Sequence, residues 1–253
     1  VTDDMLISYL NNEYCNYHKH CHYSNVVSID STVKPLDYIN RAFELGHTTV
    51  FTTQHNTALG HYEYYDLINE ANKLISALKE NLANEEQLPK IIDDNKKFDL
   101  PSALECIRNN ESYKLKYRFG TEIYFSITPE DVKMYHMIIL ARNKQGFKDI
   151  NNLLGQCCFV EGGYRNKRAK VPFDEILKLD AKNVLITTAC LASFINRLDK
   201  SIEIESVTDE VVQEKESEIQ LLGRLKDALG ESFFIELQNH NTDKQKEYNK
   251  VAL

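Results

Sequence analysis

The densest group of side chains with metal-binding chemistry is the run His18-Lys19-His20-Cys21-His22. We predict a short strand over residues 14–21. Side chains two residues apart on a strand face the same side, so His18, His20 and His22 project together. Neutral imidazole is the commonest metal ligand at neutral pH, and three histidines on one strand face rarely serve a core. The run therefore favours a metal site over a packed structural role.

Further candidates follow predicted strands. His55 follows the strand at 48–53 with one residue between, Glu122 lies near the end of the strand RFGTEIYF, and Cys190 follows VLITTA. In parallel barrels the carboxyl ends of the strands form the active face, so these side chains are expected to converge there. His136, in MYHMIIL, is open to two interpretations, a packed histidine or a ligand.

Strand-like and helix-like segments alternate along the chain, which predicts an α/β fold with a mainly parallel sheet and a barrel-like closure. The segment 83–114 breaks this rhythm because it is polar and charged, and we predict a solvated surface insertion with a short helix at 102–108. Strands are predicted at 48–53, 116–125, 134–141, 183–188 and 232–237, and helices at 35–45, 61–82, 145–159, 205–229 and after residue 237.

Bulk properties narrow the class of protein. The 253 residues suffice for one large α/β domain or two small ones, and the net charge of −8 argues against binding nucleic acid through a general positive field. The six cysteines show no framework spacing, which indicates reduced thiols and a cytoplasmic location. The start resembles no signal peptide and no apolar run is long enough for a membrane span, so no membrane partner is expected. A start without methionine and an end inside a predicted helix suggest a fragment of a longer protein.

An ordered series of sequence blocks resembles the polymerase and histidinol phosphatase (PHP) domain, and more specifically the one at the N-terminus of bacterial and phage DNA polymerase III alpha subunits. The resemblance covers nearly the whole chain, residues 1–253, apart from the segment 83–114. The blocks are HKHCHYSN, then Asp30-Ser31, then Lys34-Pro35 with a helix to Gly46, then TTQHN, FGTEIYF, HMIILARNKQGFKDINNLLGQCCFVEGGY, LITTACLAS and FFIELQNHN.

The resemblance implies a distorted TIM-like (β/α)7 barrel, truncated at its C-terminus, and a set of metal ligands. Glu122 matches a glutamate well placed to bridge two ions, and Glu122 and Asp30 are the implied catalytic residues. Gln54 departs from the family's usual aspartate, His22 falls outside the H-x-H pair, and an Asp-x-His pair is expected beyond Leu253. The implied metal ligands are His18, His20, Asp30, His55, Glu122, His136 and Cys190.

A site of this composition suits two or three divalent ions of Zn²⁺, Mn²⁺ or Fe²⁺, with Mg²⁺ as a further candidate, and the cysteine favours zinc. The resemblance implies 3′–5′ exonucleolytic phosphodiester hydrolysis beside a DNA-directed DNA polymerase. The implied partners are the rest of the polymerase chain, the primer 3′ end of DNA and other replisome subunits. Two alternatives stay open: a structural PHP domain that braces the polymerase core with weak or no hydrolysis, and a free-standing phosphatase of the histidinol-phosphate type.

Overall fold

The computed structural model describes residues 16–25, 29–127, 134–159, 164–165, 168–197 and 218–252. The chain divides into two compact units. Unit 1 comprises Val1–Gln54 and Ala58–Phe119, and unit 2 comprises His55–Thr57 and Gly120–Leu253. Among the described helices, none is both long enough and apolar enough to cross a membrane.

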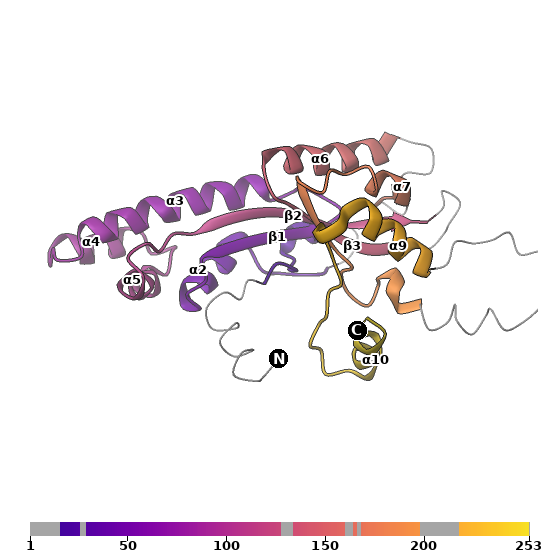
Figure 1. The fold of residues 1–253 in the computed structure, drawn as a ribbon. Coiled ribbons are helices and arrows are strands. Elements are labelled where there is room, and N and C mark those ends of the chain that lie inside the picture. The colour runs from indigo at the N-terminus through magenta and orange to yellow at the C-terminus, as the bar shows by residue number, and fades with distance from the viewer. Residues whose placement is uncertain are drawn as a thin grey trace, which may run out of the picture. The chain divides into compact units, whose positions relative to one another are not determined.

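Unit 1 is mainly helical (Figure 1). Helix α2 begins with Pro35, whose fixed φ suits the first turn, and the Asp37 carboxylate accepts a hydrogen bond of 2.8 Å from the backbone N–H of Lys34. The helices predicted at 35–45 and 61–82 are confirmed. The elements are η1 (His22–Ser24), α2 (Pro35–Glu44), β1 (Thr49–His55), α3 (His61–Glu80), α4 (Gln87–Asp94), α5 (Leu100–Asn109) and the first residues of β2 (Lys116–Ser126).

The second half of the segment 83–114 forms part of the unit 1 core. Asp99 caps α5 by accepting a hydrogen bond from the backbone N–H of Ser102, and helices α2, α3 and α5 pack against one another. The apolar side chains of α5 recur at helical spacing, which buries one face of the helix. The expectation of a solvated surface excursion is therefore wrong for this half. The buried residues of α5 are Leu100, Ala103, Leu104, Cys106 and Ile107.

Unit 2 holds most of a six-stranded sheet with the order β1-β2-β3-β7-β8, in which β6 also pairs with β2 (Figure 1). Strand β3 runs antiparallel to both β2 and β7, whereas β8 is parallel to β7 and β6 is parallel to β2. The fold is thus a mixed α/β fold, and the expectation of a mainly parallel sheet is wrong. Closure into a barrel stays a prediction.

The strands and helices predicted for this part of the chain appear with small shifts. The strand expected at 232–237 is shorter than predicted, and of the helix expected at 205–229 only α9 lies within the described residues. The elements are β3 (Tyr135–Ala141), α6 (Lys144–Phe159), β4 (Tyr164–Arg165), β5 (Arg168–Ala169), β6 (Val171–Pro172), α7 (Phe173–Ile176), β7 (Val184–Thr187), η2 (Phe194–Arg197), α9 (Glu218–Leu229), η3 (Gly230–Ser232), β8 (Phe233–Phe234) and α10 (Asp243–Ala252).

Candidate metal centre

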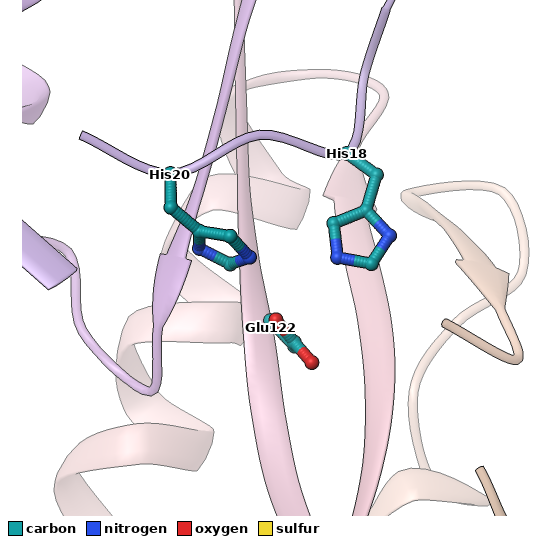
Figure 2. Close-up of side chains that lie close together, drawn as sticks. All are labelled: His18, His20 and Glu122. Carbon is teal, nitrogen blue, oxygen red and sulfur yellow. The ribbon is translucent and has the colours of Figure 1, made fainter. Parts of the chain in front are cut away.

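Strand register brings Glu122 and His136 together in unit 2. Tyr124 lies opposite His136 in the antiparallel β2–β3 pair, and Glu122 lies opposite Ile138. Side chains of cross-strand partners face the same side, so Glu122 and His136 are diagonal neighbours on one face of the sheet. Figure 2 shows the Glu122 side chain leaving strand β2. Glu122 lies in the middle of its strand, not near the end as predicted.

The two oxygens of the Glu122 carboxylate face two different histidines. His136 Nδ1 lies 2.5 Å from Oε1, and His55 Nδ1 lies 3.1 Å from Oε2. The Glu122 side chain is only 1% exposed. A carboxylate buried this deeply needs a cation or strong hydrogen-bond donors close by, because its charge has lost its hydration. Two histidines beside one buried carboxylate would be a suitable set of donors for a metal site.

Cys190 completes the group of donors in unit 2. Its Sγ lies 3.8 Å from His136 Nδ1, and ligand atoms of Glu122, His136 and Cys190 all lie within 4.8 Å of one another. Burial raises the pKa of the Cys190 thiol, and the negative charges of Glu122 and Glu236 raise it further. A neighbouring cation is what would turn this thiol into the thiolate that binds metals.

Two residues with left-handed backbone conformation adjoin these candidates. Asn56, which follows His55, has a φ of 51°, and Ala189, which precedes Cys190, has a φ of 57°. The Asn56 turn is held by a hydrogen bond of 2.7 Å from its backbone N–H to the carbonyl of Glu122. Such conformations cost roughly 1 kcal/mol for a residue with a side chain and are found most often at functional sites. Both turns set where the chain leaves a strand and so where the ligand candidate points.

In unit 1, the segment that carries His18 and His20 is not a strand. Residues 16–21 have no regular secondary structure, so the predicted strand over 14–21 is wrong in its described part. The two rings nevertheless lie on the same side of the segment, edge to face, with centroids 5.4 Å apart (Figure 2). Thr53 of β1 holds the residue between them, because the backbone N–H of Lys19 donates to Thr53 Oγ1 at 2.8 Å and the Thr53 N–H donates to the Lys19 carbonyl at 3.3 Å.

Gln54 holds the next part of this segment. Its side chain is 1% exposed and lies among Cys21, Ser24 and Thr52. The Ser24 hydroxyl also contacts His20 Nδ1 at 3.1 Å, and the Tyr38 hydroxyl donates to the His20 carbonyl at 2.8 Å. Cys21 is fully buried.

Asp30 is exposed, and its backbone position is fixed by Asn25. The Asn25 side-chain oxygen accepts from the backbone N–H groups of Asp30 and Ser31 at 2.6 and 3.0 Å. Ligand atoms of Asp30 and His20 lie within 4.8 Å of each other, as do those of His18 and His20. His20 is therefore the central member of the unit 1 set. Its Nδ1 is the atom that faces Ser24.

The supporting residues Ser24, Asn25, Thr53 and Ala189 were not predicted. Their types are common in loops and strands, and no spacing marks them out from the sequence alone. Glu236 was missed as well: it is a buried carboxylate that accepts hydrogen bonds from Thr187 Oγ1 at 2.9 Å and Gln238 Nε2 at 2.8 Å. Each of these residues is recognised only from the contacts that the fold creates.

Histidine nitrogens, carboxylate oxygens and one thiolate are donors suited to Zn²⁺ and other divalent transition metals. Unit 2 by itself brings three such donors together, with a buried carboxylate among them, and in unit 1 His20 lies close to His18 and to Asp30. The side chains present therefore fit a metal site.

Comparison with known proteins identifies the class. The PHP domain family matches residues 16–240, and the chain belongs to this family. It is 25% identical over 155 residues, 58% of this chain, to a DNA polymerase III subunit alpha of Borreliella burgdorferi, and 29% identical over 122 residues, 47% of this chain, to that of Treponema pallidum. It is 23% identical over 245 residues, 92% of this chain, to a probable DNA polymerase, YorL, of Bacillus subtilis and to a DNA-directed DNA polymerase of Bacillus phage SPbeta.

These relatives are much longer than the present chain. The matched regions span 12%, 9%, 17% and 17% of the four proteins, so the chain corresponds only to their PHP regions. The resemblance inferred from the sequence blocks is confirmed at the level of the family and of its polymerase-type members.

Proposed function

We propose that the chain is the PHP domain of a replicative DNA polymerase of the III alpha type, and that it binds two or three divalent metal ions to hydrolyse phosphodiesters from a DNA 3′ end. The proposed ligands come from both units of the chain. They are His18, His20, Asp30, His55, Glu122, His136 and Cys190.

One observation supports this proposal above the others: the buried Glu122 carboxylate has one histidine at each oxygen and Cys190 nearby. Within unit 1, Thr53 and Gln54 hold the segment that carries His18 and His20. A purely structural domain has no evident need for this group of donors, several of which are costly to bury.

The residues have separable roles in the proposed reaction. When bound, divalent ions supply an activated water and neutralise the charge that develops on the phosphate. Glu122 fixes the spacing of the ligands around it, because each of its oxygens lies beside a different histidine and its side chain is buried. His136 and His55 orient the carboxylate, and Asp30, which is exposed, is placed to exchange protons with solvent. Cys190 contributes a soft donor that favours zinc.

Nuclease assays of the full-length protein test the proposal. A 3′-labelled single-stranded oligonucleotide is incubated with Mn²⁺ or Zn²⁺ and with variants His18→Ala and Glu122→Gln. We expect both variants to lose about 100-fold or more of the metal-dependent rate. His47→Ala, which removes a half-buried histidine outside the ligand set, is the matched control and should retain the rate.

Equal rates in all variants would contradict the proposal, because the hydrolysis would then originate elsewhere in the protein. A wild-type protein without metal-dependent hydrolysis would contradict it as well. That second outcome would leave the family assignment intact and would favour a structural PHP domain that braces a polymerase core.

A further inference from the structure

Gln54 has a side-chain orientation that its surroundings determine. The backbone N–H of Cys21 points at Oε1 from 2.9 Å, and a backbone N–H is always a donor, so this end of the amide must be the oxygen. The other end, Nε2, donates to Thr52 Oγ1 at 2.8 Å and contacts Cys21 Sγ at 2.9 Å. The amide is buried. In the opposite orientation its NH2 group would face the backbone N–H of Cys21, and two donors cannot form a hydrogen bond.

This orientation fixes the direction of the next hydrogen bond. Ser24 Oγ lies 2.6 Å from Gln54 Oε1, and an amide oxygen can only accept, so the serine hydroxyl is the donor. A hydroxyl has one hydrogen to donate. Ser24 Oγ and His20 Nδ1 lie 3.1 Å apart, and in this hydrogen bond the histidine Nδ1–H must therefore be the donor.

From these contacts we infer that Gln54 is a positioning residue: acting through the Ser24 hydroxyl, it holds His20 in the tautomer with its proton on Nδ1. The lone pair of the neutral imidazole then lies on Nε2, so Nε2 is the nitrogen whose lone pair can bind an ion. The inference adds to the proposed function, since it rests on His20 being a ligand and names the residue that prepares it.

An amide suits this position for a further reason. A carboxylate at residue 54 would also accept from Ser24 and Cys21, but it would place a negative charge at a buried position. The Gln54 amide sets the same direction without adding charge, and its Nε2 finds an acceptor in Thr52. The departure from the family's usual aspartate is thus compatible with an intact site.

Long-range ¹H–¹⁵N NMR of the metal-free chain with ¹⁵N-labelled histidine tests the inference directly. The chain has eight histidines, and a His20→Gln variant identifies the His20 signals by their disappearance. We expect His20 to show a protonated Nδ1 and an unprotonated Nε2. A wild-type His20 with its proton on Nε2 would overturn the inference.

Variants separate control of the His20 tautomer from a general structural role of these residues. Ser24→Ala removes the hydroxyl and leaves the contact between Gln54 and Cys21, so His20 should become a mixture of tautomers and metal affinity should fall about 10- to 100-fold. Ser24→Thr keeps a hydroxyl and should restore the wild-type tautomer. Thr52→Val removes a different hydrogen bond of Gln54 and should leave the tautomer unchanged.

An unchanged His20 tautomer in a folded Ser24→Ala variant would also overturn the inference. Because the NMR measurement needs no metal, it stands apart from the proposed function. A chain with the expected tautomer and no metal binding would contradict the proposed function while upholding the role of Gln54.

Discussion

Glu122 and His136 stand on paired strands of the sheet, whereas His18 and His20 stand on a segment without regular secondary structure. The strand pair is fixed by a ladder of backbone hydrogen bonds, so no one side chain decides where its ligands lie. The H-x-H segment depends on side chains, chiefly Thr53, Gln54 and Tyr38. The comparison indicates that single polar substitutions should disturb the second set of ligands far more than the first.

The largest expected effect is on the free energy of unfolding, and it comes from a substitution of Gly146 in the first turn of α6. A Cβ at this position would lie 2.0 Å from the backbone oxygen of Asn183, just before strand β7. Backbone atoms cannot yield as a side chain can, so Gly146→Ala should lower the free energy of unfolding by about 2–3 kcal/mol. Urea unfolding followed by circular dichroism measures the change.

Gly155→Ala in the same helix is the matched control. A Cβ at Gly155 meets no atom within 4 Å, so this variant should gain about 1 kcal/mol from better helix propensity. Equal stability of the two alanine variants would contradict the close approach of α6 to the backbone just before β7.

An intermediate effect is expected in the H-x-H segment. Thr53→Val keeps the shape of the side chain and removes the oxygen that accepts from the Lys19 N–H. We expect a loss of about 1–2 kcal/mol in unfolding free energy and faster amide exchange at Lys19. Thr49→Val, at the half-exposed start of the same strand, should change stability by less than about 0.5 kcal/mol. Slow exchange at Lys19 in the Thr53→Val protein would mean that the segment has other, sufficient support.

The smallest expected effect on stability is at the turn before Cys190. Ala189→Gly relieves a left-handed backbone conformation, so the unfolding free energy should stay the same or rise by up to about 1 kcal/mol. Metal affinity should fall nonetheless, because the turn that aims Cys190 becomes mobile. Ala103→Gly, in helix α5, should instead lose about 1 kcal/mol. A loss of stability at Ala189 as large as that at Ala103 would rule out strain in the turn.

Sequence patterns located most elements because their signals are local. Helix α2 has a proline start and Gly46 after its end, and strands β1 and β7 are rich in β-branched residues. Ligand candidates were found from residue type and from resemblance. The fold brings Glu122, His136 and Cys190 together, and the ligand role of each candidate stays a prediction.

The errors have physical causes. The alternation of histidines imitates a strand, yet Lys19 donates its N–H to the Thr53 side chain and not to a strand ladder. The sheet was expected to be mainly parallel, although the stretch between Ser126 and Tyr135 is too short for the crossover that parallel strands require. The core role of α5 was missed because surrounding charges concealed apolar residues at helical spacing, such as Leu100 and Ile107.

Metal binding by the purified chain tests the central claim most directly. Titration with Zn²⁺ and with Mn²⁺ by calorimetry, followed by elemental analysis after gel filtration, gives the affinity and the number of ions per chain. The account predicts at least one tightly held ion in the wild-type protein and a loss of about 100-fold or more in affinity for Glu122→Gln, with His47→Ala unchanged. A wild-type chain that retains no ion, or a Glu122→Gln chain that binds as well as the wild type, would contradict it.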